Sequence, residues 1–190
     1  QPATTYAYDE LGKLVSVTMP PTEDYASPAI TRFGYDRNRN KTSQKDARGH
    51  ETTYGHDRAN RMTRMIEPGN LVTDTVYDAN GNVLVFTDAN GATATSLYDE
   101  LGRKKSTTYA ASPSTPSTAW REVVSESFEY DENGNPLKVH RFVAAGTDPP
   151  QDRAIVRTFD ALDRLKTETT SLPDGGTRTV GYEYHPNGTR

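Results

Sequence analysis

Short runs of strand-forming residues, separated by tight turns, repeat along the whole chain. The clearest copy extends from Val76 to Gly91: an aromatic residue leads into Asp, Gly follows three residues after that Asp, and a run of Val, Leu, Phe and Thr precedes a second Asp-x-x-Gly turn. Asp accepts hydrogen bonds from nearby backbone N–H groups, and Gly enters the left-handed backbone region without steric cost, so both favour turns. Val, Phe and Thr suit a pleated strand. The pattern therefore predicts β-hairpins, and no segment shows sustained helical periodicity.

The aromatic residue before each turn is an anchor, position zero, from which the copies can be aligned. The anchors are Tyr8, Tyr35, His56, Tyr77, Tyr98, Tyr130, Phe159 and Tyr184. Position one is Asp in seven copies: Asp9, Asp36, Asp57, Asp78, Asp99, Asp131 and Asp160. Position four is Gly12, Arg39, Asn60, Gly81, Gly102, Gly134, Asp163 and Gly188. Because Gly, Asn and Asp best tolerate positive φ, position four is expected to be left-handed; beside the exception, Arg39, we expect Asn38 to take that role.

The spacing of the anchors predicts a single repeat array across residues 1–190. Successive anchors lie 27, 21, 21, 21, 32, 29 and 25 residues apart, which gives a base period of 21 and insertions at 19–28, 111–119 and 144–152. Second turns begin eleven residues after three anchors, at 46–49, 67–70 and 88–91. The array has about eight units, and each 21-residue unit holds two strands and two short turns, which requires antiparallel pairing. The fold class is predicted to be all-β, built from repeated antiparallel hairpins.

Aromatic side chains lie two residues apart before five of the turns, as in Tyr6 and Tyr8 or Phe33 and Tyr35. Side chains alternate between the faces of a strand, so both rings share one face. In stacked repeats these rings are expected to form ladders of cross-strand contacts that pack the array. A platform for binding carbohydrate is the alternative interpretation.

Composition excludes several classes of function. Hydrophobic residues make up 33% of the chain, the net charge is −4, and there is no cysteine. We therefore expect no general attraction to nucleic acid, no disulfide framework and no thiol chemistry. The chain has no run of about 18 apolar residues, so membrane insertion is not expected. It begins at Gln1 and ends inside the eighth unit, and we interpret it as a segment of a longer array.

A search for reactive or metal-binding residues finds no convincing constellation. Asp-x-Asn-Gly-Asn at 78–82 and 131–135 resembles part of a calcium loop but lacks the further ligands and flanking helices of an EF-hand. Asp and Asn are also ordinary turn residues, which is the interpretation we favour. The four histidines show no metal-ligand spacing, and Arg58, Arg61 and Arg64 fit a solvated turn or strand edge. We therefore expect no catalytic, cofactor or metal site, and assign the anchors and their Asp and Gly partners a structural role.

Four segments carry a resemblance to a known family: Tyr-Asp-Glu-Leu-Gly-Lys-Leu at 8–14, Tyr-Asp-Ala-Asn-Gly-Asn at 77–82, Tyr-Asp-Glu-Leu-Gly-Arg at 98–103 and Tyr-Asp-Glu-Asn-Gly-Asn at 130–135. These resemble the YD repeats of the Rhs family, which includes bacterial polymorphic toxins, the C component of insecticidal toxin complexes, bacterial wall-associated proteins and the animal teneurins. The resemblance covers essentially the whole chain. It implies a curved, spiralling sheet that forms part of a hollow shell.

The same resemblance implies a function and its partners. The chain would be a non-catalytic part of a secreted or cell-surface protein whose shell encapsulates a C-terminal toxin or effector for delivery. Its partners would be other repeats of the same protein and the enclosed polypeptide. The alternative is an adhesion-type module that binds carbohydrate or a cell-surface protein. Exposed sheet edges lead us to expect that the isolated chain self-associates.

Overall fold

The computed structural model describes residues 3–22, 26–110, 123–143, 153–172 and 175–185, and these ranges contain strands and turns but no helix. The all-β prediction is therefore confirmed. No apolar helix of membrane-spanning length occurs in the described part of the chain. The predicted insertions at 111–119 and 144–152 and the anchor partner Gly188 lie outside it, while Met19, the first residue of the insertion at 19–28, still belongs to a strand.

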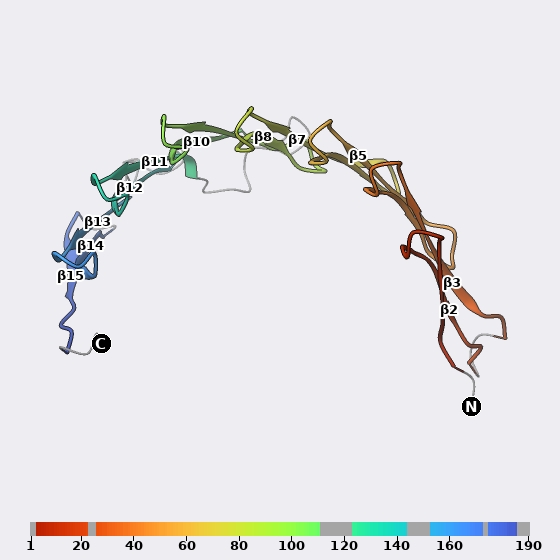
Figure 1. Cartoon of the computed structure of the whole chain (residues 1–190). Coiled ribbons are helices and arrows are strands. Elements are labelled where there is room, and N and C mark those ends of the chain that lie inside the picture. The colour runs from red at the N-terminus through yellow and green to blue at the C-terminus, as the bar shows by residue number, and fades with distance from the viewer. Residues whose placement is uncertain (1–2, 23–25, 111–122, 144–152, 173–174, 186–190) are drawn as a thin grey trace. The chain divides into compact units, whose positions relative to one another are not determined.

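Fifteen strands follow one another in the described residues, as labelled in part in Figure 1. They are β1 (Thr5–Tyr8), β2 (Leu14–Met19), β3 (Ala29–Tyr35), β4 (Lys41–Lys45), β5 (Glu51–His56), β6 (Met62–Glu67), β7 (Leu71–Tyr77), β8 (Val83–Thr87), β9 (Thr93–Tyr98), β10 (Lys104–Ala110), β11 (Val123–Tyr130), β12 (Pro136–Val143), β13 (Arg153–Phe159), β14 (Leu165–Ser171) and β15 (Thr177–Gly181). Every anchor but Tyr184 is the last residue of its strand.

The chain divides into two compact units. The first comprises Gln1–Tyr77 with Phe86–Gly91, and the second Asp78–Val85 with Ala92–Arg190. In the first unit β1 to β7 pair in sequence order, each antiparallel to the next. In the second unit β9 to β15 pair in the same way. Within β1 to β7 and within β9 to β15, each strand contacts its neighbours along the sequence.

The turns after the first seven anchors share one backbone geometry. The N–H of Gly12 donates to the carbonyl of Asp9 at 3.0 Å, and the N–H of Asp9 donates to the carbonyl of Lys13 at 2.9 Å. This is a three-residue hairpin loop, a type I turn followed by one left-handed residue. Position four has positive φ throughout the described turns, from 57° at Asp163 to 95° at Gly81. The expectation for Asn38 was wrong: Arg39 itself adopts φ 70°, because the hydrogen bonds of the loop fix which position must be left-handed whatever residue occupies it.

A β-bulge follows six of these turns. Ala7 pairs with Ser16 but Tyr8 pairs with Leu14, so Val15 is an extra residue in β2. The same register shift occurs in five further hairpins, where the extra residue is again the seventh after the anchor. A bulge bends its strand and increases the local twist. The repeat therefore builds a bend into one strand of each of these six hairpins.

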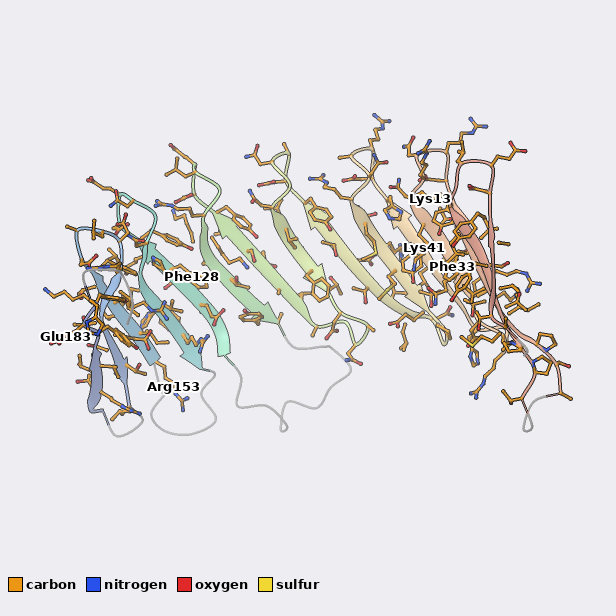
Figure 2. All side chains as sticks on the ribbon, turned by 60° about the horizontal axis from the view of Figure 1, so that its bottom comes forward. Lys13, Phe33, Lys41, Phe128, Arg153 and Glu183 are labelled. Atoms are coloured by element: carbon orange, nitrogen blue, oxygen red, sulfur yellow. The ribbon has the colours of Figure 1, made fainter. Side chains whose placement is uncertain are left out.

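Figure 2 shows the side chains on the strands of the two units, with Phe33 on β3 and Phe128 on β11 among those labelled. No hydrophobic side chain among the described residues is fully buried; the two buried residues are Ser96 and Thr107, paired across β9 and β10. Burial of apolar surface against a second layer is therefore not what orders these strands. The specific contacts must lie within the sheet, between one hairpin and the next.

Candidate functional site

The candidate site is a contact that recurs between consecutive hairpins, and it begins at the Asp of position one. One oxygen of Asp78 accepts hydrogen bonds from the N–H groups of Asn80 at 2.9 Å and Asn82 at 2.8 Å. Its other oxygen accepts from the Asn82 side-chain amide at 2.8 Å. In all seven hairpins of this type an oxygen of the Asp accepts the N–H of position five; the Asp residues are Asp9, Asp36, Asp57, Asp78, Asp99, Asp131 and Asp160.

These hydrogen bonds lower the pKa of the carboxyl groups, because they favour the charged form. The side-chain amide of Asn40, Asn82 or Asn135 is the largest cause at Asp36, Asp78 and Asp131. The Arg61 guanidinium has that role at Asp57, and the backbone N–H of Arg164 has it at Asp160. At Asp99, partial desolvation is the largest single effect and acts to raise the pKa. The hydrogen bonds from the side chain and backbone of Arg103 together outweigh it, so the pKa of Asp99 is lowered as well.

The residue at position five reaches forward to the next anchor when it is a cation. The guanidinium of Arg61 lies 4.6 Å from the centre of the Tyr77 ring, and that of Arg103 lies 4.8 Å from the Tyr130 ring. Arg164 and Tyr184 repeat this at 4.6 Å, and Lys13 and Tyr35 at 5.6 Å. A cation within about 6 Å of a ring centre is attracted to its face. Four anchor rings, those of Tyr35, Tyr77, Tyr130 and Tyr184, thus meet a cation of the preceding hairpin.

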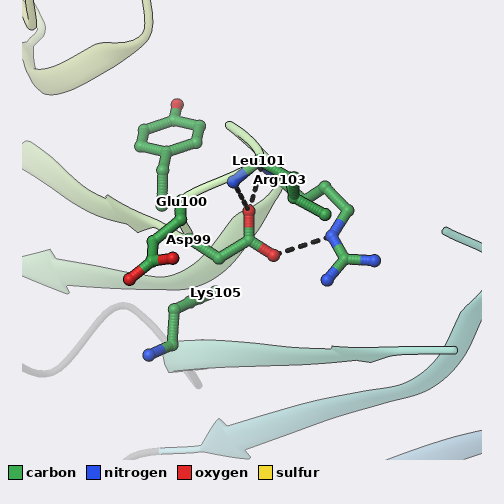
Figure 3. A pocket seen from close by; sticks show the side chains of 6 residues that line it. Asp99, Glu100, Leu101, Arg103 and Lys105 are labelled. Atoms are coloured by element: carbon green, nitrogen blue, oxygen red, sulfur yellow. Dashed lines mark hydrogen bonds and ion pairs between the residues drawn. The ribbon is translucent and has the colours of Figure 1, made fainter. Parts of the chain in front are cut away.

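The same guanidinium also holds its own turn. Arg103 donates from Nε to Asp99 at 2.7 Å and from Nη1 to the carbonyl of Asp131 at 3.0 Å. Figure 3 shows the bonds of Asp99 to Arg103 and to the backbone of Leu101, at a hollow lined also by Tyr98, Glu100 and Lys105. Arg61 bonds Asp57 and Arg164 bonds Asp160 equally closely, at 2.7 Å from Nε. One side chain therefore links a turn carboxylate to the following hairpin.

The anchor hydroxyl makes a return contact. Tyr130 donates its hydroxyl to the carbonyl of Lys104 at 3.0 Å. Lys104 is position six of the preceding hairpin, next to its bulge. The same bond joins Tyr35 to Leu14, Tyr77 to Met62, Tyr98 to Val83 and Tyr184 to Leu165, at 2.9 to 3.0 Å. We call the position-five cation over the ring, together with this hydroxyl bond, the clamp.

Two anchors lack the phenol. Phe159 has no hydroxyl, and the shorter ring of His56 has a buried Nδ1 atom without a hydrogen-bond partner in the described structure. In the His56 hairpin, Lys41 instead lies over Tyr54 at 4.3 Å. The aromatic position thus tolerates other rings where the cation of position five is missing.

Some side-chain contacts between strands could not be found from the sequence pattern. Glu126 accepts hydrogen bonds from the Tyr109 hydroxyl at 3.0 Å and from Nε of Arg141 at 2.7 Å. These residues meet because β10, β11 and β12 pair in a particular register. The clamp itself had a signal, since a basic residue or Asn follows position four in the first seven copies. Of the arginines considered as a basic patch, Arg61 is held by Asp57 and Arg64 lies 3.5 Å from Asp74.

No group of three or more His, Asp or Glu side chains that could hold a metal ion occurs in the described residues. The turn carboxylates instead bond to the backbone and to position five. The arrangement is suited to fixing one hairpin against the next.

Comparisons with known proteins agree with a repeat architecture. The family model for the RHS repeat matches residues 40–72 and 77–114. The chain is similar in fold to the crystal structure of TcdB2-TccC3-Cdc42, with a TM-score of 0.57 and 13% identity over 98% of this chain and 12% of that one. For TcdB2-TccC3 without its hypervariable C-terminal region, the TM-score is 0.54 and the identity 13%, over 100% of this chain and 12% of that one. For a Tc holotoxin pore of Photorhabdus luminescens, the TM-score is 0.53 and the identity 14%, over 95% of this chain and 12% of that one. A search of curated protein sequences gives no match.

Proposed function

We propose that the chain is a non-catalytic wall segment of a larger RHS-repeat protein, whose β-shell encloses a C-terminal toxin or effector polypeptide for delivery; the match of the RHS-repeat family model to residues 40–72 and 77–114 supports this. The chain spans about 12% of the length of the solved chains whose fold it shares. Its partners would be further repeats and the enclosed polypeptide. The protein would be secreted or displayed at the cell surface, as the Tc toxin likeness favours.

The observation that carries this proposal is a sheet whose faces are uncovered and whose hairpins are fixed by recurring contacts. None of the described hydrophobic side chains is fully buried, although rings recur on one face of each hairpin. A wall needs many uniform strands and no reactive group. Confinement is then the mechanism: the sheet separates the cargo from its surroundings until release.

The face that carries the anchor rings is proposed to face the enclosed volume. On β5, Thr52 shares that face with Tyr54, while Thr53 lies on the opposite face. The chain has no cysteine, so Thr52→Cys and Thr53→Cys each introduce a unique thiol, one residue apart on the same strand.

Labelling with a bulky maleimide tests the proposal. In the isolated 190-residue chain both thiols should react. In the larger protein that carries these repeats, the thiol of Thr52→Cys should be protected and that of Thr53→Cys should react at its rate in the isolated chain. Equal reaction of both thiols in the larger protein would show that this sheet does not separate an inside from an outside.

A carbohydrate- or surface-binding module is the second candidate, and one observation favours it. The rings of Tyr6 and Tyr8 on β1 are 58% and 61% exposed, unlike the clamped anchors. Exposed rings can stack on sugars. A glycan array on the purified chain, with Tyr6→Ala as the comparison, tests this function: binding that the substitution abolishes would support it, and an array without signal would exclude the glycans displayed.

A further inference from the structure

Positions three and five of the turn alternate in step along the chain. Four hairpins have a cation at position five: Lys13, Arg61, Arg103 and Arg164. The three hairpins between them have Asn there: Asn40, Asn82 and Asn135. At position three the first set has Leu11, Ala59, Leu101 and Leu162, and the second set has Asn38, Asn80 and Asn133. We call the first set clamp hairpins and the second set bridge hairpins.

The two sets make different contacts with the hairpin that follows. Each clamp hairpin places its cation over the next anchor ring, and that anchor is always a hydrogen-bonded tyrosine. Each bridge hairpin directs its Asn towards position four of the next turn. Asn40 donates to the Asn60 side chain at 2.8 Å, and Asn135 donates to Asp163 at 2.7 Å.

The third bridge hairpin fits the same geometry. Asn82 faces Gly102, and a methyl group placed on Gly102 would lie 3.9 Å from both polar atoms of the Asn82 amide. The anchors that lack a phenol, His56 and Phe159, both follow bridge hairpins. Their occurrence there is consistent with the chemistry, because the bridge acts at the turn and does not require a ring under a cation.

We propose that the structural unit of this array is a pair of hairpins, and that position five determines which contact a hairpin makes with its successor. A cation at position five requires tyrosine at the next anchor. An Asn at position five relaxes that anchor and can bond a polar side chain at the next position four, as it does at the left-handed Asn60 and Asp163. This pairing goes beyond the proposed wall function and holds whether or not cargo is enclosed.

Arg103→Asn separates the two roles of position five. The introduced amide can still bond Asp99, as Asn82 bonds Asp78 and Asn135 bonds Asp131. The contacts with Tyr130 and with the Asp131 carbonyl are lost. Arg103→Ala, which also loses the bond within the turn, is the matched comparison. Both are made in the full 190-residue chain, and circular dichroism checks that each variant folds.

Hydrogen exchange measured by mass spectrometry is the readout. Arg103→Asn should raise exchange of the β10 and β11 amides by roughly fivefold to thirtyfold, the effect of losing about 1–2 kcal/mol, and leave the amides of the 99–103 turn unchanged. Arg103→Ala should raise exchange both at the β10 and β11 amides and at the amides of the 99–103 turn. If Arg103→Asn leaves β10 and β11 unchanged, or if the turn opens as much as the strands do, position five does not select the contact.

A conversion of the contact gives the second test. Gly134→Asp places a carboxylate at position four of the following turn, where an added Cβ would meet no atom within 4 Å. In the otherwise unaltered chain it should increase exchange of β10 and β11, because φ is +89° there. Combined with Arg103→Asn it should decrease exchange relative to that variant, since a bridge like that of Asn135 and Asp163 can form. Additive effects of the two substitutions would overturn the pairing.

Discussion

At the scale of single residues, this chain is ordered by hydrogen bonds and ring contacts in place of a packed core. The Asp at position one fixes the turn, position four accommodates positive φ, and position five connects the turn to the next hairpin. Arg39 shows how strongly the loop is fixed, because even a long side chain adopts φ 70° there.

Gly81→Val should destabilise the chain more than Ala79→Val. Gly81 has φ 95°, where a β-branched residue is penalised by about 1–2 kcal/mol, whereas Ala79 is an exposed residue of the same turn without positive φ. Urea unfolding compares the two variants directly. Equal midpoints would mean that the turn does not depend on position four.

Tyr130→Phe should cost about 0.5–1.5 kcal/mol, because it removes the hydroxyl bond to Lys104 but leaves the ring beneath Arg103. Tyr6→Phe is the control, since that ring is 58% exposed in β1. The free energy of unfolding from urea titration distinguishes them. A loss at Tyr6 as large as that at Tyr130 would contradict the role given to the clamp.

At the scale of the hairpin, each element closes on itself and then reaches one neighbour. The turn, the bulge and the anchor lie at the same end of the hairpin, so the contacts between hairpins concentrate there. The remaining length of each strand relies on its backbone ladder and on local side-chain pairs such as Arg157 and Glu168, 2.8 Å apart.

Acid should weaken the hairpins. The pKa values of Asp36, Asp57, Asp78 and Asp131 are lowered from the ordinary 3.8 in the folded chain, chiefly by side-chain hydrogen bonds. The unfolded chain therefore binds more protons in this range, and stability is present above about pH 4 to 5 and is lost as the pH falls through the folded pKa values.

The urea midpoint as a function of pH measures this effect. Asp131→Asn should lower the urea midpoint at pH 7, because the charged carboxylate is lost. In acid the difference between this variant and the unaltered chain should shrink, because Asp131 is then protonated in the unaltered chain and the Asn side chain does not titrate. A midpoint that rises as the pH falls would show that the carboxylates are not stabilised in the folded state.

Removal of metal ions should leave stability unchanged. The oxygens of Asp78 already accept bonds from Asn80 and Asn82, so the Asp-x-Asn-Gly-Asn turns satisfy themselves. Thermal unfolding with EDTA and with added calcium provides the measurement. A melting temperature that falls in EDTA and recovers with calcium would instead identify Asp78, Asn80 and Asn82 as ligands.

At the scale of the whole molecule, the described strands leave sheet edges and apolar side chains exposed. In the structure as described, β1 pairs with β2 and β15 with β14, which leaves one edge of each with unpaired N–H and C=O groups. Tyr6 and Tyr8 add exposed apolar surface at β1. Edges of this kind pair with other strands unless something blocks them.

The isolated chain should therefore self-associate, most simply through edge pairing into a symmetric dimer. Light scattering over a concentration series measures the mass. Asp9 directs its N–H to β2, so by alternation Thr5 and Ala7 also face β2 while the N–H of Tyr6 lies on the free edge. Tyr6→Pro removes this edge donor and should reduce the association, and Tyr6→Ala, which keeps the donor, is the control. The mass of one chain up to high micromolar concentration would defeat the edge argument.

The sequence by itself determined the strands, the turns and their order, because these depend on local chemistry: Asp and Gly at fixed offsets start and end a loop, and a short loop allows only antiparallel neighbours. It also placed the anchors and predicted their structural role. Tertiary structure alone decided what the anchors contact. The cation over Tyr130 and the cluster of Glu126 with Tyr109 and Arg141 depend on strand register, which a bulge shifts by one residue. Arg39 belongs to this second group, since the loop imposes a backbone conformation that its side chain does not favour.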